Sequence, residues 1–192
     1  MSRKPQLVIK FDASTMAFLE TQRLLFRAHA AEDESEFVRL QTDPEVRRYV
    51  GGQGRGWSLE KARDRFRNEY LGRPRETYGL WATILKEEGK YIGCCGLRAG
   101  QDGTAAHLGY YFAQAYWRQG FASEASRAFI DVAFTRLRLL RLGADVELGN
   151  AASEHILRKF GFRYVSREQI PRSGRVLLLY ELSKAEWERG KT

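Results

Sequence analysis

The chain has 192 residues, enough to bury a hydrophobic core in a single domain without disulfides or metal ions. Its composition, 43% hydrophobic and 29% charged, is that of a soluble globular protein, and no apolar run suits a membrane span or a signal peptide, so we expect a cytoplasmic protein. Lys and Arg outnumber Asp and Glu by 32 to 24, and this charge of +8 favours a phosphate-bearing partner, but it is spread along the chain and nucleic acid is not the expected one.

The N-terminal part of the chain becomes regular near residue 20. Residues 1–19 hold a short apolar run in a charged setting, which suits either a flexible arm or an added edge strand. Residues 21–27 (TQRLLFR) are the first clear strand. Asp33 is the expected cap of the helix that follows, in which Phe37 and Leu40 lie on one face.

Two further helix starts follow. Asp43 and Pro44 suit the cap and first position of a short helix that ends at the glycines of segment 51–56 (GGQGRG). That segment lacks the Lys-Ser/Thr ending of a phosphate-binding P-loop, so we interpret it as a mobile linker. Ser58 begins a third helix, with apolar residues at Ala62, Phe66 and Tyr70.

The middle of the chain has the period of strands. An antiparallel meander is the simplest arrangement, with strands at 78–85, 91–97 and 107–112 joined by turns at 86–90 and 99–103. The adjacent cysteines, Cys94 and Cys95, would face opposite sides of a strand. They have no metal-binding or redox spacing, so we expect core filling and no metal site.

The third of these strands leads into a helix through a turn of small residues. Backbone N–H groups at a helix start have no partners within the helix, and with the positive end of the helix dipole they form a seat for a phosphate group. Arg118 lies in the same turn, where it could contact the same anion. An ordinary strand-to-helix connection with a surface arginine is the alternative that this turn alone leaves open.

The remaining elements close the domain. A helix over 123–137 with one apolar face, followed by a strand over 142–148, implies a right-handed crossover and a parallel pair with the strand at 107–112. Asn150 is the expected cap of a helix that ends at Gly161. A hairpin with strands at 162–167 and 175–182 completes the pattern.

This order of elements resembles the GNAT superfamily of acyl-CoA-dependent N-acetyltransferases. Within it, the chain is similar to the RimJ/RimL type, whose namesakes acetylate the N-termini of ribosomal proteins. The carrying stretches are TQRLLFR (21–27), DPEVRRYVGG (43–52), LGYYFAQAYWRQGFASEA (108–125) and NAASEHILRKFGF (150–162).

The resemblance implies an α/β (α+β) GNAT fold, in which a mixed central sheet with a splayed parallel strand pair is flanked by helices. It covers a single acetyltransferase domain over residues 20–185, preceded by an extension (1–19) and followed by a tail (186–192). The family's loop Gln/Arg-x-x-Gly-x-Gly/Ala is matched at Gly120 and Ala122, while the first position holds Trp117, as is common in this branch.

The resemblance also implies acetyl-CoA as acyl donor. The turn at 119–123 would hold its pyrophosphate through backbone N–H groups, and its pantetheine would fill the gap between the splayed strands, where backbone N–H groups can also stabilise an oxyanion. The expected cofactor-binding residues are Tyr110, Tyr111, Phe112, Arg118, Gln119, Gly120, Phe121, Ala122, Ser123 and Asn150. Glu124 in the same turn suits the helix dipole, and we interpret it as structural.

Two catalytic residues are expected. Ser153 completes the family's Asn-x-x-Ser pattern and would protonate the leaving thiolate, whereas a first-turn serine is the simpler interpretation. His107 stands where related sequences often carry a glutamate and is our candidate base, with a surface histidine as the alternative. His155 falls on another face of its helix and is expected at the surface.

The acceptor is expected to be a primary amine. The branch resemblance favours a protein N-terminal α-amine, as in a ribosomal protein; a small-molecule amine (antibiotic, polyamine or amino acid) or a non-catalytic acyl-CoA- or RNA-binding module are the alternatives. The protein would be a monomer or a homodimer and would not bind a membrane. Candidates for the acceptor mouth, or else a solvated basic face, are Arg47, Arg48, Tyr49 and Trp57.

Overall fold

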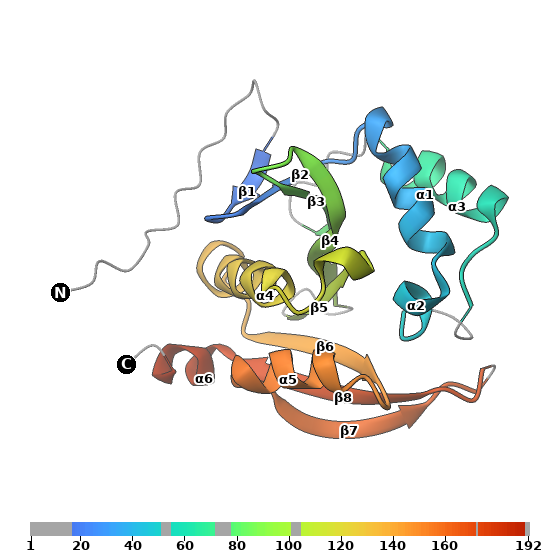
Figure 1. The fold of residues 1–192 in the computed structure, drawn as a ribbon. Coiled ribbons are helices and arrows are strands. Elements are labelled where there is room, and N and C mark those ends of the chain that lie inside the picture. Colours follow the sequence, from blue (N-terminus) through green and yellow to red (C-terminus); the bar gives the residue numbers. More distant parts are fainter. Residues whose placement is uncertain (1–16, 51–54, 72–77, 101–104, 172, 191–192) are drawn as a thin grey trace.

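The computed structural model describes residues 17–50, 55–71, 78–100, 105–171 and 173–190. A sheet of eight strands runs through them in the order β1-β2-β3-β4-β5-β6-β8-β7, with helices packed against it (Figure 1). This is the mixed sheet flanked by helices that the sequence predicts. No helix in these ranges has the length and apolar character needed to cross a membrane.

The strands lie within a few residues of their predicted positions. Their bounds are β1 Ala17–Glu20, β2 Leu24–Arg27, β3 Gly79–Leu85, β4 Lys90–Ala99, β5 Ala105–Phe112, β6 Arg141–Glu147, β7 Arg163–Gln169 and β8 Val176–Ser183. The helices are α1 Glu34–Thr42, α2 Pro44–Arg47, α3 Leu59–Arg65, α4 Phe121–Asp131, α5 Ala151–Lys159 and α6 Lys184–Arg189. Single π-helical turns extend α3 over Phe66–Tyr70 and α4 over Val132–Arg136.

The parallel pair β5–β6 is short. It comprises three residue pairs, which end at His107 and Gly143, whereas β6 goes on to pair with β8 as far as Glu147. Beyond His107 the two strands diverge, and Figure 1 shows β6, β8 and β7 turned away from β3–β5. The predicted splay is therefore confirmed, and it begins one residue after the last pair.

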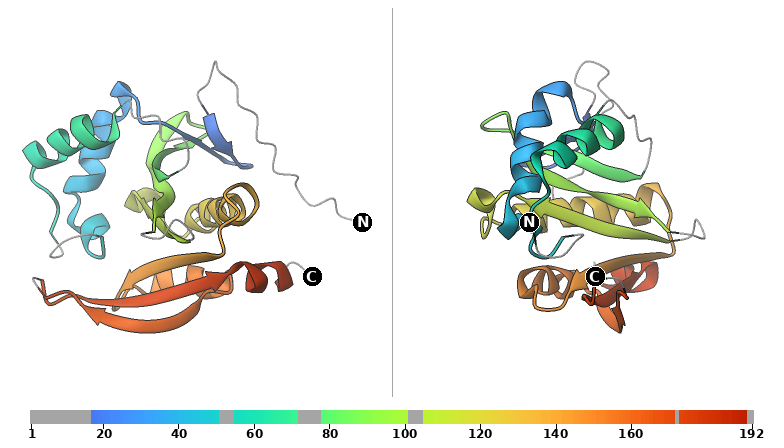
Figure 2. Two further views of the ribbon diagram at one scale, coloured as in Figure 1. Left: turned by 180° about the vertical axis from the view of Figure 1, so that it is seen from behind. Right: turned by 90° about the vertical axis from the view of Figure 1, so that its right-hand side faces the viewer.

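Two hydrophobic cores cover the two faces of the sheet. Leu108 and Phe112 of β5 belong to the first core, with residues of α4 and α5. Tyr111 belongs to the second core, with residues of α1, α2 and the π-helical turn after α3. Figure 2 shows α1, α2 and α3 gathered on one side of strands β2–β5 and α4 on the other. Because side chains alternate along a strand, His107 lies on the face of Tyr111, and Tyr110 lies on the opposite face.

The beginning of the chain differs from expectation in two places. Residues Ala17–Glu20 form the edge strand β1, and the predicted strand at 21–27 begins only at Leu24 because Thr21 N–H donates to the Leu24 carbonyl at 2.8 Å and closes a turn. Asp33 occupies the predicted cap position before α1, but its side chain makes no capping hydrogen bond to that helix: its carboxylate accepts from Ala30 N–H at 2.8 Å and pairs with Arg27 at 2.6 Å. The apolar run within residues 1–16 lies outside the described residues.

The other predicted helix starts are confirmed. Asp43, Ser58 and Asn150 each accept a backbone hydrogen bond from the first turn that follows. The helix predicted over 123–137 starts two residues earlier, at Phe121. Part of the predicted tail belongs to α6, which Ser183 caps, and most of segment 51–56 lies outside the described residues.

Candidate active site

The turn between β5 and α4 has a backbone suited to an anion. Arg118 has a φ of +60° and Gly120, the residue that caps α4, a φ of +82°. Holding a residue other than glycine in the left-handed region costs on the order of 1 kcal/mol of conformational free energy. Such strained residues are common in functional turns. The first helical hydrogen bond runs from Glu124 N–H to the Gly120 carbonyl, so the N–H groups of Phe121, Ala122 and Ser123 have no acceptor within α4.

A network of side-chain hydrogen bonds from the segment before β2 stabilises this turn. The Glu124 carboxylate accepts from the Thr21 hydroxyl at 2.6 Å, from Arg23 N–H at 2.9 Å and from Arg23 Nε at 2.6 Å. Arg23 also donates to the Gln119 carbonyl at 3.0 Å and lies 4.3 Å from the centre of the Phe121 ring. Burial would raise the pKa of Glu124, but the hydrogen bonds from Thr21 and Arg23 hold it below its usual value.

Sequence reasoning did not assign Arg23 to this site. The residue lies in the TQRLLFR stretch, which carries part of the family resemblance, and that was the only available signal. Glu124, which we predicted to be structural because it suits the helix dipole, also accepts hydrogen bonds from Thr21 and Arg23.

The unpaired edge of β5 leads into this turn. From Leu108 to Phe112, no described strand pairs with the side of β5 that faces β6. Trp117 donates from Nε1 to the Phe112 carbonyl at 2.7 Å and fixes the loop at the end of the strand. The side chains of Tyr111 and Phe112 are buried, so these two predicted cofactor residues can offer a ligand only their backbone groups.

Ser153 and Asn150 lie across the gap from β5. Asn150 Oδ1 accepts from Ser153 N–H at 3.2 Å, which confirms the helix cap. The Ser153 hydroxyl lies 3.0 Å from the Tyr110 hydroxyl, so the two groups bridge β5 and α5 beyond the point where the strands diverge. Burial raises the pKa of Tyr110 to about 12, against the opposing effect of the bond to Ser153, so the phenol is neutral at physiological pH.

His107 lies at the start of the splay on the other face of the sheet. Its Nδ1 is 3.1 Å from Oδ1 of Asp145, and its side chain is 44% exposed. Asp145 also accepts two hydrogen bonds from Arg98, at 2.9 and 3.2 Å. The structure therefore places His107 and Ser153 on opposite faces of the sheet.

Of the predicted acceptor residues, Tyr49 and Arg48 are at least partly exposed, whereas Arg47 is buried. Tyr49 lies beside the junction of β6 and α5: a Cβ added to Gly149 would be 3.9 Å from its ring. Arg48 is exposed and pairs with Glu45 at 3.6 Å. His155 is exposed, as expected.

Arg47 is buried and lies against Trp57. Its guanidinium is 4.3 Å from the centre of the Trp57 ring and donates to Gln41 Oε1 at 3.0 Å. Burial lowers the pKa of Arg47. Its contacts join α1, α2 and the segment before α3, so packing of these helices is part of its role.

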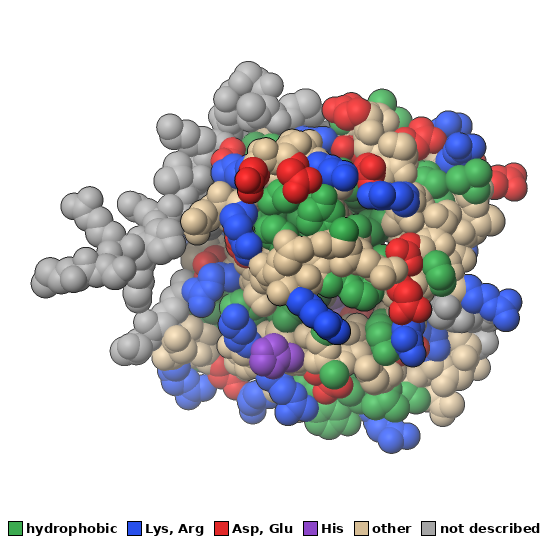
Figure 3. Space-filling view, in the orientation of Figure 1, with side chains coloured by type: hydrophobic (Ala, Val, Ile, Leu, Met, Phe, Trp, Pro, Cys, Tyr) green, Lys and Arg blue, Asp and Glu red, His purple; other side chains and the backbone are tan. Residues whose placement is uncertain are grey.

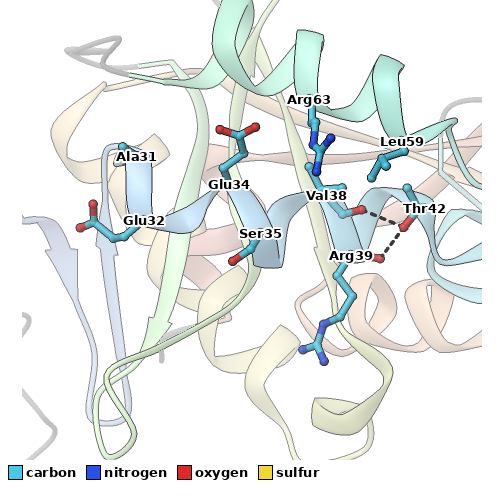
Figure 4. Close-up of a pocket in the computed structure, with 9 residues that line it drawn as sticks. All are labelled: Ala31, Glu32, Glu34, Ser35, Val38, Arg39, Thr42, Leu59 and Arg63. Atoms are coloured by element: carbon cyan, nitrogen blue, oxygen red, sulfur yellow. Dashed lines mark hydrogen bonds between the residues drawn. The ribbon is translucent and has the colours of Figure 1, made fainter.

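One cavity in the described residues lies elsewhere. About 550 Å³ of space lies between α1 and α3, where Glu34 and Arg63 point toward the neighbouring helix (Figure 4). None of the predicted site residues lines it. Figure 3 shows Lys and Arg side chains scattered over one face of the molecule without forming one patch, so surface charge does not mark a site there either.

Comparisons with known proteins agree with this geometry. A family model described as an acetyltransferase (GNAT) domain matches residues 23–163. The uncharacterized N-acetyltransferase p20 of Bacillus licheniformis is 31% identical over 171 residues, which cover 88% of this chain and 96% of that protein.

Two solved structures illustrate the range of similar folds. RimL, described as a ribosomal L7/L12 alpha-N-protein acetyltransferase in complex with coenzyme A, has a TM-score of 0.70 at 15% identity and covers 85% of this chain and 95% of its own. The spermidine/spermine N-acetyltransferase SpeG of Vibrio cholerae has a TM-score of 0.67 at 14% identity and covers 90% of this chain and 100% of its own. At these identities the likeness shows the fold alone.

The family match spans β2 to the start of β7 and includes both the turn between β5 and α4 and the diverging strands. Together with the identity to p20 over most of both chains, it shows that the chain belongs to the GNAT family of acetyltransferases.

Proposed function

We propose that the chain transfers the acetyl group of acetyl-CoA to a primary amine, and that its preferred acceptor is a protein N-terminal α-amine. The observation that carries this proposal is the unpaired edge of β5, which leads directly into the start of α4. A strand edge without a neighbour suits the amides of pantetheine, and free helical N–H groups suit a pyrophosphate.

The residues of the turn fit such a ligand. Gly120 adopts the left-handed conformation and carries no side chain of its own at the helix start, and Arg23 and Glu124 fix the turn through their hydrogen bonds. When bound, acetyl-CoA supplies the activated acyl group as a thioester. The backbone N–H groups of Tyr110 to Phe112 that face the gap would stabilise negative charge on the thioester carbonyl oxygen.

Ser153 is the proposed proton donor for the thiolate. The neutral Tyr110 phenol can donate to Ser153 Oγ, so that as the C–S bond breaks the serine proton would move to the sulfur and the phenol proton to Oγ, after which Tyr110 would regain a proton from water. Asn150 holds the helix start at which Ser153 lies.

His107 is the proposed base. As the amine nitrogen forms its bond to the carbonyl carbon, its excess proton passes to the imidazole, directly or through one water molecule. The donor and the base lie on opposite faces of the sheet, so the thiol leaves toward α5 and the amine enters from the face of Tyr111. Tyr49, Arg48 and Trp57 would then border the acceptor side, with the buried Arg47 packed against Trp57.

An α-amine suits this machinery because it requires little from a base. At pH 7 its deprotonation costs about 1 kcal/mol, against between about 4 and 5 kcal/mol for a lysine amine. The description of RimL supports the same acceptor class, whereas that of SpeG supports a polyamine as the second candidate.

The test is release of CoA thiol from acetyl-CoA with matched acceptors. A peptide with a free N-terminus, the same peptide with a blocked N-terminus and a free lysine, and spermidine separate the three amine classes. We expect kcat/KM to be highest for the free N-terminus. Preference for spermidine would replace the protein acceptor by a small molecule, and no thiol release with any amine would leave a non-catalytic acyl-CoA-binding module.

A further inference from the structure

The imidazole of His107 on β5 reaches over to the neighbouring strand β6 and contacts it. Its position opposite Gly143 is the last of the parallel pairs, so the ring lies where the two strands begin to separate. A Cβ added to Gly143 would lie 3.1–3.3 Å from three of the ring atoms, so the ring rests on the strand where that side chain is missing. From there its Nδ1 reaches Asp145 on the neighbouring strand at 3.1 Å.

The charges around this ring come from three strands. Arg98 on β4 donates twice to the carboxylate of Asp145, and Arg141 on β6 lies 3.8 Å from Glu181 on β8, on the same face of the sheet. Burial acts to raise the pKa of Asp145, but the hydrogen bond with His107 and the charge and hydrogen bonds of Arg98 outweigh it and hold the pKa below its usual value. The carboxylate is therefore ionised at neutral pH.

An ionised carboxylate can only accept hydrogen bonds, so a neutral imidazole bonded to it must carry its proton on Nδ1. Its lone pair is then on Nε2, the nitrogen that faces away from Asp145. We propose that Asp145 is a positioning residue for catalysis: it fixes His107 in the tautomer whose Nε2 can accept the proton of the amine. This inference rests on the proposed function of His107 as the base.

The role of Asp145 extends through the proton transfer. When the amine forms its C–N bond, the proton it releases becomes bound to Nε2, and the ring carries a positive charge until it returns that proton to water. Asp145 lies in contact with that charge, and Arg98, which pairs with His107 across β4 and β5, orients the carboxylate through its hydrogen bonds. The thiolate receives a different proton, from Ser153, so each transfer is accounted for.

The first arm of the test does not depend on activity. The chain has three histidines, and nitrogen chemical shifts of the ¹⁵N-histidine-labelled protein report the tautomer of each; the His107→Gln variant identifies the signals of His107. We expect the neutral ring to carry its proton on Nδ1 in the wild type. In Asp145→Asn, whose amide can donate to Nδ1, the proton on Nε2 should become the main form, and Asp145→Glu should restore the original tautomer in part.

The second arm measures kinetics with an α-blocked lysine, because this acceptor depends most on a base. We expect Asp145→Asn to lower kcat about a hundredfold while the KM for acetyl-CoA stays within about twofold, on the usual scale of general base catalysis. Glu181→Gln is the matched control. Glu181 lies on the same face of the sheet, on the neighbouring strand β8 opposite Gly143, so this variant also removes one carboxylate, and it should retain wild-type kcat.

The outcomes separate the inference from the proposed function. A proton on Nε2 in the wild type, or Asp145→Asn kinetics equal to those of Glu181→Gln, overturns the role of Asp145 while acetyl transfer stands. Absence of thiol release from the wild type with every amine overturns the proposed function and the catalytic role of Asp145 with it. The nitrogen spectra would then still show whether the carboxylate sets the tautomer.

Discussion

Arg23 and Glu124 are 101 residues apart in the sequence and form two hydrogen bonds with each other, from the backbone N–H and from Nε of the arginine. Their contact joins the loop before β2 to the first turn of α4. Through the bond from Arg23 to the Gln119 carbonyl, it also reaches the backbone that would hold the pyrophosphate.

Loss of the arginine should therefore weaken the turn. We expect Arg23→Gln to raise the KM for acetyl-CoA about tenfold and to leave kcat within about threefold, because the turn loses order while the catalytic groups keep their places. Glu124→Gln should have a similar effect. The double variant should raise the KM for acetyl-CoA by about as much as either single variant, because both substitutions remove the same contact. Full additivity measured by calorimetry with CoA would show that the two residues act independently.

The Glu124 carboxylate should also make stability depend on pH. Its pKa is lowered in the folded protein, so its contribution is present above the unfolded value, near 4.3, and is lost as the pH falls through the lower folded value. At pH 7 we expect Glu124→Gln to lower the free energy of unfolding by about 1–2 kcal/mol, the scale of a hydrogen-bonded charge in a mostly buried site. Urea unfolding of both proteins should show this difference shrinking below about pH 4; a constant difference would contradict it.

Gly120 is the next test of the turn. Its φ of +82° is strained for any side chain, and a glutamate there would also place a negative charge at the proposed phosphate site. We expect Gly120→Glu to weaken CoA binding more than about a hundredfold in a protein that still folds. Gly161→Ala is the control, because Gly161 has nearly the same φ, +85°, at the end of α5 and should affect stability alone. Unchanged CoA affinity in folded Gly120→Glu would remove the central claim about the turn.

Ser153→Ala tests the proton donor. Without the hydroxyl we expect kcat to fall by about ten- to a thousandfold, while CoA affinity barely changes. Tyr110→Phe should give a smaller loss, because it removes the group that orients the serine but leaves the serine proton in place. His155→Gln, an exposed change on the same helix, should leave both constants unaltered. A wild-type kcat in Ser153→Ala would show that Ser153 is not the proton donor and that its role is structural, at the start of α5.

His107→Gln tests the base with two acceptors. An α-amine is partly neutral at pH 7, so its kcat/KM should fall less than about tenfold, whereas that of a lysine amine should fall about a hundredfold or more. The measurement is the ratio of the two losses at one pH, which cancels any shared effect on folding or CoA binding. Equal losses for the two amines would indicate a structural effect, and no loss would indicate a water chain.

Much of the fold could be predicted because its signals are local. The caps Asp43, Ser58 and Asn150 each bond within three residues, and strand periodicity located β3 to β5. Asp33 stands at the predicted cap position, but its side chain does not cap α1 because Arg27 on β2, six residues earlier, forms an ion pair with the carboxylate.

The site was harder to predict because its contacts span the chain. Tyr110 was expected to act through its backbone alone, yet its hydroxyl meets Ser153, 43 residues away. Asp145 has no motif of its own and gains its place only through the register of β6 beside β5. Arg47, predicted at the acceptor mouth, is buried because α2 packs its guanidinium against Trp57.

The divergence of β5 and β6 has a consequence for the order of events. Because the proposed thiol side and the proposed amine side lie on opposite faces of one sheet, neither substrate would have to leave before the other could enter. We therefore expect both to occupy the protein together and the acetyl group to pass directly from one to the other, without an intermediate on a side chain. Initial rates measured over a grid of both substrate concentrations should then give double-reciprocal lines that intersect, as a ternary complex requires, and an acetylated form of the protein should not accumulate when the amine is withheld.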